Sequence, residues 1–157
     1  MSVSTEKKKL IEEIGLQLES RLNLAPLAAR IYTLLTLSSK EGLTFEQIRE
    51  IIGSSKSSTS VNLKILMQLK HVDYYTKSGD RKRYFRITTY FQLSALKIDY
   101  QALENEILLV EKINSYNKVH HPEKFKNEES VGDIIRNYLK SRQTLIAETI
   151  DKINKHG

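Results

Sequence analysis

Hydrophobic residues recur at helical spacing through the first forty positions of the chain. From about Glu6 to Leu22 they return every three or four residues, which predicts an amphipathic helix: Leu10, Ile11, Ile14, Leu18 and Leu22. Pro26 then suits the first turn of a second, more apolar helix, which ends near Lys40. Two helices separated by a short break therefore open the chain.

The next pattern is that of two helices joined by a tight turn. Thr44 is a good N-cap for a helix from Phe45 to Ile52, and Gln47 is placed to complete a capping box. Gly53 permits the left-handed backbone that such a turn requires. A second helix, residues 55–69, has positions at helical spacing that should face a core: Thr59, Leu63, Leu66 and Leu69.

An alternation with a period of two follows, which is typical of strands. Apolar or aromatic residues alternate with polar ones in the ranges 72–77 and 84–87, and Ser78-Gly79-Asp80 supplies a turn between them. The sequence therefore predicts a β-hairpin directly after the two helices. Together these elements form a winged helix-turn-helix over residues 43–88.

Beyond residue 89 the period returns to that of long helices. A heptad-like seam precedes Pro122, which ends its helix: Leu93, Leu96, Tyr100, Leu103, Ile107 and Val110. A final helix, from about Ser130 to Ile153, carries one broad apolar stripe: Val131, Ile134, Ile135, Tyr138, Leu139, Leu145, Ile146, Ile150 and Ile153. The predicted fold class is mainly α, a winged helix-turn-helix with a small β-hairpin wing and long N- and C-terminal helices.

These long helices carry more apolar surface than a winged domain of about 65 residues can cover. The economical solution is a second copy of the chain, which gives a two-fold homodimer. We therefore expect a winged helix-turn-helix DNA-binding domain at 24–90, and a helical dimerisation region formed by 4–22 and 91–155. Packing of the helices within one chain is the alternative.

Composition narrows the function classes. The chain has 157 residues, of which 39% are hydrophobic and 28% charged, and a net charge of +6. Residues 43–90 hold nine lysines and arginines against four acidic residues, a net +5, so the positive charge is concentrated there. The absence of cysteine excludes disulfides, thiol redox sensing and Cys-ligated zinc. No apolar run approaches the ~20 residues of a membrane span, and the N-terminus lacks the apolar core of a signal peptide, so we expect a cytoplasmic protein that does not contact membranes.

Charge and small hydroxyl groups gather on the open side of the second helix and at the hairpin tip, which favours double-stranded DNA as a partner. Hydroxyl side chains let the backbone approach bases and phosphates, and lysine and arginine neutralise phosphate. The candidate DNA-binding residues are Thr44, Lys56, Ser57, Ser58, Ser60, Val61, Asn62, Lys64, Lys77, Arg81, Lys82 and Arg83. Two alternatives remain open, namely that residues 54–60 form only a solvated cap and that the hairpin is an ordinary exposed one.

The residues that carry this pattern also resemble a known family. These residues are Ala29-Arg30-Ile31-Tyr32 with Leu34-Leu35, Leu43-Thr44 with Ile48, the run from Ser55 to Ser60 with Asn62-Leu63-Lys64, and Gly79-Asp80-Arg81-Lys82 with Tyr84. They are similar to the MarR superfamily of winged-helix regulators, and within it to the GbsR-like branch. The resemblance covers about residues 15–90. It implies a homodimeric transcription factor, often a repressor, that acts on an inverted-repeat operator and is tuned by a small-molecule effector or by protein contacts.

The chain departs from that family at three places. Similar proteins usually have Gly where Ser57 stands and a small apolar residue where Thr59 stands. They often have Gly-Leu-Val in place of Lys70-His71-Val72, so we expect strain or a shifted cap at the end of the second helix. The register of the hairpin depends on that helix end.

Other chemistry finds little support in the sequence. Aromatic residues at 74, 75, 84, 85, 90 and 91 are numerous enough for a cation-binding cage, but aromatic residues of strands are more often core, and we assign no effector ligand. His120-His121 with Glu123 is better interpreted as a solvated loop than as a metal site. No catalytic motif is present, so we expect no enzyme activity, no cofactor and no metal. A protein-binding adaptor is the alternative function, but it should show apolar or acidic residues where Lys56, Ser57, Ser60 and Lys64 stand.

Overall fold

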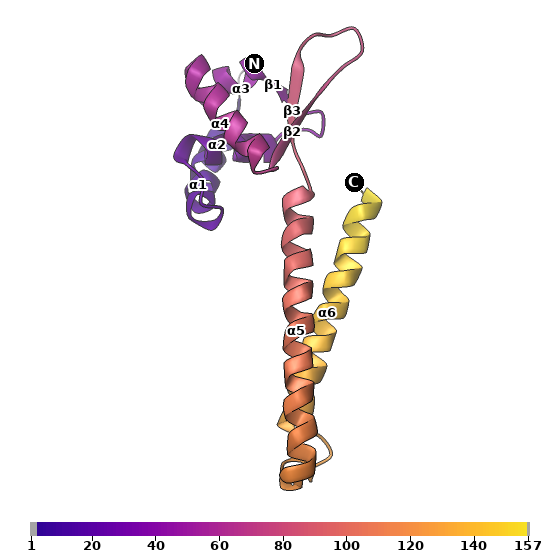
Figure 1. The fold of residues 1–157 in the computed structure, drawn as a ribbon. Coiled ribbons are helices and arrows are strands. Elements are labelled where there is room, and N and C mark those ends of the chain that lie inside the picture. Colours follow the sequence, from indigo (N-terminus) through magenta and orange to yellow (C-terminus); the bar gives the residue numbers. More distant parts are fainter. Residues whose placement is uncertain (1–2, 157) are drawn as a thin grey trace. The chain divides into compact units, whose positions relative to one another are not determined.

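The computed structural model describes residues 3–156. The elements follow in the order α1 (Thr5–Arg21), α2 (Pro26–Thr36), β1 (Leu43–Thr44), α3 (Phe45–Ile52), α4 (Lys56–Gln68), β2 (Val72–Thr76), β3 (Arg83–Ile87), α5 (Tyr90–His120), the 3₁₀ turn η1 (Pro122–Phe125) and α6 (Val131–His156) (Figure 1). The chain divides into two compact units, one ending at Tyr90 and the other beginning at Phe91. The mainly α, winged helix-turn-helix fold class predicted from the sequence is confirmed.

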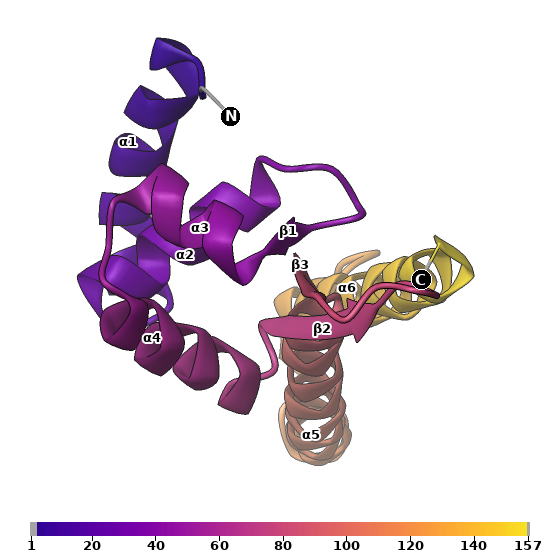
Figure 2. The same cartoon turned by 90° about the horizontal axis from the view of Figure 1, so that it is seen from above.

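Helix α2 is the centre of the first unit. Ala28, Ala29, Ile31 and Leu34 are fully buried, because α1, α3, α4 and β3 all pack around this helix. The hydroxyl of Thr33, which is buried with them, donates a hydrogen bond to the Ala29 carbonyl at 2.8 Å, so its burial leaves no unpaired donor. Figure 2 shows α2, α3 and α4 grouped beside the small sheet. The helix-turn-helix is therefore held on a packed, apolar support.

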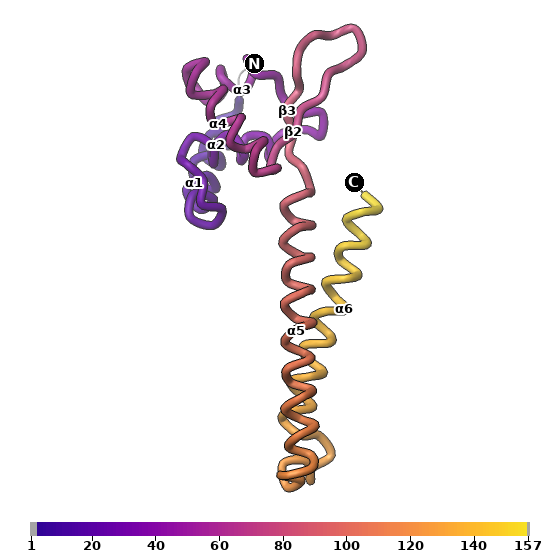
Figure 3. Tube along the Cα trace, in the orientation of Figure 1, coloured from indigo at the N-terminus to yellow at the C-terminus, as the bar shows by residue number. Residues whose placement is uncertain are grey.

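The sheet has three strands in the order β1-β3-β2, all antiparallel. Leu43 pairs with Phe85 and Tyr74 pairs with Phe85 on the other side, which fixes the register of the hairpin. Gly42 is required beside β1, because its φ is 75° and a Cβ there would collide with the Phe85 carbonyl oxygen. The sequence predicted the hairpin but missed the two-residue strand β1. Figure 3 traces the loop that joins β2 to β3.

The end of α4 differs from expectation at one residue. Thr59, Leu63 and Leu66 are buried as predicted, but Leu69 is 48% exposed, so its assignment to the core was wrong. The helix ends at Gln68 with Leu69 as C-cap, and Lys70 takes a left-handed φ of 59°. A left-handed backbone is uncommon for a residue other than glycine. The strain expected at this helix end is confirmed by the left-handed Lys70, whereas Leu69 still has helical backbone angles and lies at the edge of the buried face.

Helix α1 packs against α2 in the first unit. Ile11 is buried in its core, and Leu18 packs against the same cluster. Arg30 of α2 adds ion pairs to Glu12 at 3.1 Å and Glu19 at 3.5 Å. In the single chain α1 therefore belongs with the winged elements, and the assignment of residues 4–22 to a dimerisation region stays a prediction.

The second unit is a hairpin of two long helices, with α6 running back along α5 (Figure 1). Its core cluster consists of Leu103, Ile107 and Leu139, with Val110 and Ile146 packed against it. The part of the predicted α5 seam around Leu103 and Ile107 therefore faces α6. On α6, Leu139 is the buried member of the predicted apolar stripe among the described residues, and five other members are exposed in the single chain, so the expected covering of the stripe by a second copy stays a prediction: Val131, Ile134, Ile135, Tyr138 and Leu145.

Two further observations concern the helices. Asn114 is buried in the α5–α6 seam beside Gly132, where a Cβ would collide with the Asn114 Oδ1 atom, a close approach that the apolar pattern did not reveal. Within the described part of the chain, no helix has the length and apolar character needed to span a membrane.

Candidate nucleic-acid interface

The turn between α3 and α4 is built from local hydrogen bonds. Thr44 and Gln47 form the reciprocal capping box at the start of α3, with backbone-to-side-chain distances of 3.3 and 2.9 Å. Gly53 takes the left-handed conformation with φ 72°. Ser55 caps α4 by accepting a hydrogen bond from the Ser58 backbone N–H at 3.1 Å. The capping box and the glycine turn predicted from the sequence are confirmed, and together they set the direction of α4.

The exposed face of α4 is polar, small and free of acidic groups. Thr59, Leu63 and Leu66 face the core, which leaves a stripe of exposed residues at helical spacing on the other side: Ser57, Ser60, Val61 and Lys64. Lys56 and Ser58 are also exposed, at the N-terminal end of the helix. A helix with this face can lie against an anionic, hydrogen-bonding surface without burying an unpaired charge.

Four of the candidate side chains also make hydrogen bonds within the helices. The Asn62 amide nitrogen donates to the Ser58 carbonyl at 2.8 Å, and Asn62 is only partly exposed. The Ser55 hydroxyl donates to the Ser58 hydroxyl at 2.9 Å and lies 3.5 Å from the Ser57 hydroxyl. Thr44, likewise, uses its hydroxyl oxygen to cap α3. Asn62, Ser58 and Thr44 hold the local geometry, whereas Ser57 lies with Ser60, Val61 and Lys64 on the exposed stripe.

The wing brings further cations to the same side of the first unit as α4. A groove of about 430 Å³ separates α4 from the hairpin and is lined by Phe45, Ser60, Leu63, Lys64, Met67, Arg81, Arg83 and Phe85. Its charged members are all basic, and the others are apolar apart from Ser60. We call it the helix–wing groove. The structure therefore brings together Ser60, Lys64, Arg81 and Arg83 from two separate parts of the sequence.

Asp80 organises the tip of the wing. Its carboxylate accepts hydrogen bonds from the Lys82 backbone N–H at 2.9 Å and from the Tyr84 hydroxyl at 2.7 Å. These bonds, the Lys82 backbone bond first, hold the pKa of Asp80 below its usual value, and the bond to Asp80 raises the pKa of Tyr84. The acidic group of the tip is therefore occupied by the chain itself, and Arg81, Lys82 and Arg83 remain exposed beside it.

Lys77 is placed differently from the other wing cations. Its amine pairs with the Glu41 carboxylate at 3.1 Å and lies 4.2 Å from the centre of the Tyr84 ring. The hydrogen bond to Glu41 raises the pKa of Lys77. Lys77 does not line the helix–wing groove, so the structure separates it from Lys64, Arg81 and Arg83. Glu41 lies 36 residues away along the chain, and no sequence signal indicated this pair.

The aromatic residues of the hairpin are paired with cations of the chain itself. Arg83 lies over Tyr74, Arg86 over Tyr75, and Lys70 over Tyr90, at 4.4 to 4.6 Å from the ring centres. Phe85 is buried in the core. The rings stabilise the wing and its arginines, and the described residues do not arrange them as an open cage.

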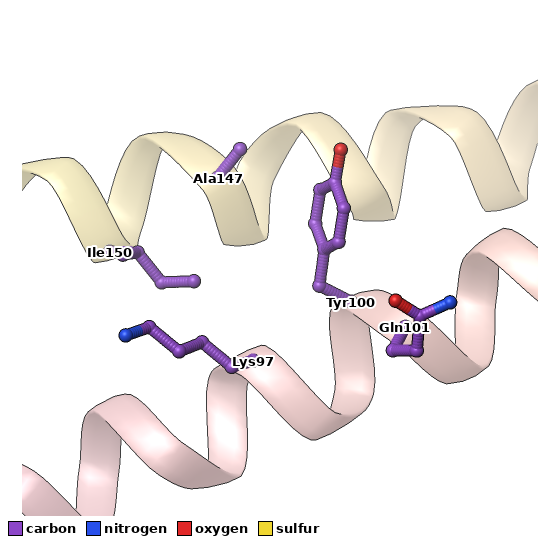
Figure 4. Close-up of a pocket in the computed structure, with 5 residues that line it drawn as sticks. All are labelled: Lys97, Tyr100, Gln101, Ala147 and Ile150. Atoms are coloured by element: carbon purple, nitrogen blue, oxygen red, sulfur yellow. The ribbon is translucent and has the colours of Figure 1, made fainter.

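Three observations bear on other functions. Within the described residues, no group of three or more His, Cys, Asp or Glu side chains could hold a metal ion. His120 lies on α5, stacked on Tyr116 at 4.2 Å, and His121 pairs with Glu123 at 3.6 Å. Between α5 and α6, Figure 4 shows a hollow of about 410 Å³ lined by Lys97, Tyr100, Gln101, Ala147 and Ile150. Its polar groups are an amine, an amide and a phenol.

Comparisons with known proteins agree with the geometry. No family model matches the chain. A curated relative, the HTH-type transcriptional regulator MmpR5 of Mycobacterium tuberculosis (strain ATCC 25618 / H37Rv), is 28% identical over 87 residues, which cover 55% of this chain and 52% of the relative. The chain thus spans about half the length of that relative.

Among solved structures, the crystal structure of a transcriptional regulator matches with a TM-score of 0.54 and 19% identity, covering 96% of this chain and 99% of that one. A Staphylococcus aureus MepR–DNA complex matches more weakly, with a TM-score of 0.43, 16% identity and coverage of 69% and 94%. The first of these two matches supports the winged helix-turn-helix fold described above.

Proposed function

We propose that this chain is a DNA-binding transcriptional regulator of the MarR type, a repressor that binds an inverted-repeat operator as a homodimer. The observation that carries the proposal is the helix–wing groove, where Lys64 of α4 and Arg81 and Arg83 of the wing meet with no acidic side chain among the described residues that line it. Phosphates of a DNA backbone are the partner that such a groove fits, because each contact with a cation releases condensed counterions. The GbsR-like assignment and a small-molecule effector rest on the sequence resemblance alone.

The geometry of α4 supports the same proposal. Its exposed stripe begins at the N-terminal end of the helix, the end that contacts base edges in helix-turn-helix complexes. Ser57 and Ser60 are short, so the helix backbone can approach the floor of a major groove closely. The wing cations lie to one side and reach a phosphate strand while α4 reads bases.

The homodimer is supported by the second unit. Three hydrophobic residues form the buried core cluster of its described part, which is too small a core for two helices of 31 and 26 residues. Large apolar side chains are exposed on both helices, among them Leu109, Ile113 and Tyr116 on α5 and Tyr138 and Leu145 on α6. Exposed apolar surface of this extent marks a protein interface. A second copy offers the same surface and closes it with two-fold symmetry.

The experiment that tests the function is fluorescence anisotropy of the full chain with the DNA upstream of its own gene, in the presence of scrambled competitor. Binding that survives a large excess of competitor supports a sequence-specific regulator. Equal, weak binding to both DNAs would contradict it. Sedimentation of the free protein tests the dimer separately, since a monomer at micromolar concentration would remove that part of the proposal.

A further inference from the structure

Val61 is an apolar residue in the middle of a polar helix face. It is 57% exposed and lies between Ser57, Ser60 and Lys64 on the outward stripe of α4. Because Ser57 and Ser60 are short, the two methyl groups of Val61 stand above the surface that surrounds them. Packing among the described residues does not explain a valine here, and a β-branched residue lowers helix propensity at an exposed position.

The residues beside Val61 at the centre of α4 are poorly suited to the usual ways of reading a base pair. The commonest specific contacts are bidentate, from Arg or Lys to guanine and from Asn or Gln to adenine. Helix α4 contains no arginine, its Lys56 and Gln68 lie at the two ends of the helix, and the amide nitrogen of Asn62 donates to the Ser58 carbonyl at 2.8 Å. Lys64 lines the helix–wing groove with Arg81 and Arg83, where the phosphate strand is expected. What remains at the centre of the face is two hydroxyls and two methyl groups.

Only one base offers a methyl group in the major groove. Thymine carries its C5 methyl there, and apolar side chains contact it, whereas hydroxyl groups of serine accept from or donate to several bases. An isolated valine flanked by serines therefore matches a thymine flanked by bases that the serines read with little selectivity.

We propose that Val61 determines operator specificity by contacting the C5 methyl of one thymine in each half-site. The inference rests on the proposed function, since it applies only if α4 lies in the major groove. Val61 would then set which half-sites are accepted, while Lys64, Arg81 and Arg83 would set how tightly any DNA is held.

The test removes the methyl group from the DNA instead of from the protein. A preferred duplex is selected from a random library with the full chain, and each thymine is replaced in turn by deoxyuridine, which lacks only the C5 methyl. For the unmodified protein we expect one position in each half-site at which the replacement weakens binding about fourfold, the value of one buried methyl group. Changing both half-sites should weaken binding by about fifteenfold.

The variant Val61→Ala completes the cycle. It should bind the thymine duplex more weakly and should no longer distinguish thymine from deoxyuridine at that position. Leu69→Ala is the matched control, because Leu69 is also an exposed apolar residue at the end of the same helix but lies off the outward stripe. This control should keep the full deoxyuridine effect. Thermal unfolding of both variants checks that they fold.

Two results would overturn the inference and are distinguishable from each other. If the protein selects a duplex but no deoxyuridine replacement matters, or if Val61→Ala keeps the effect, Val61 does not read thymine although the regulator function stands. If no duplex is selected over random DNA, the proposed function itself fails, and this inference fails with it.

Discussion

Removal of a single cation from the helix–wing groove should change how DNA binding depends on salt. Lys64, Arg81 and Arg83 come from two parts of the chain and line one groove, so each is expected to contact a phosphate. Each contact contributes about 0.9 to the slope of log affinity against log salt concentration. A dimer loses two contacts with each substitution, so Arg81→Ala should reduce the slope by about 1.8.

The effect is large enough to measure by fluorescence anisotropy between about 50 and 200 mM salt. Because the slope changes by about 1.8, raising the salt over that range should cost the variant roughly tenfold less affinity than it costs the unmodified protein. The affinity should fall for operator and scrambled DNA alike, because phosphate contacts carry no sequence information. Lys124→Ala is the matched control, since Lys124 is an exposed lysine of η1 outside the groove.

One outcome would refute this reasoning. If Arg81→Ala, Arg83→Ala and Lys64→Ala all kept the slope of the unmodified protein, the groove would not hold phosphates. Lys77→Ala provides an internal comparison: because Lys77 is paired with Glu41, its removal should reduce the slope less than the removal of Arg81 does.

Three further predictions concern stability and assembly. Leu66→Ala should lower the free energy of unfolding by roughly 2–5 kcal/mol in urea titrations, whereas Leu69→Ala should change it little. Equal losses would contradict the burial of Leu66 and the exposure of Leu69. Burial beside Tyr32 lowers the pKa of His71 below 6.5, so the stability that the neutral imidazole contributes should be complete above that pH and should be lost as the pH falls through the lowered pKa. His71→Gln should flatten this dependence of the unfolding free energy on pH, and an unchanged pH profile would refute the prediction. Ile113→Glu should shift the dimer to monomer in sedimentation, whereas Ser115→Glu, at an exposed polar position of α5, should not. A dimer that survives Ile113→Glu would exclude this face of α5 from the interface.

Local signals account for most of what the sequence predicted correctly. The capping box of Thr44 and Gln47, the left-handed Gly53 and the hairpin turn each depend on residues within a few positions of one another. The buried positions of α4 follow from the helical period, apart from Leu69 at the end of the helix, which is exposed. Caps and periodicity are therefore sufficient to place the helix-turn-helix.

Contacts between distant parts of the chain account for what the sequence missed. Strand β1 exists only because Leu43 and Thr44 pair with Phe85 and Tyr84, and the ion pair between Lys77 and Glu41 joins residues 36 positions apart. The apolar pattern of α6 could not show which part of its stripe α5 covers, and in a single chain that part lies around Leu139. No pattern within one element reveals its partner, so these features required the structure.

The measurement that tests the central claim most directly is selection of duplexes from a random library by the full chain. A dimer whose α4 helices enter successive major grooves should enrich one inverted repeat, with half-site centres about 10–10.5 base pairs apart. Each half-site should contain a thymine at the position that Val61 is proposed to contact. Enrichment of no sequence, or of a single half-site without two-fold symmetry, would contradict the account of this chain as a dimeric, operator-binding regulator.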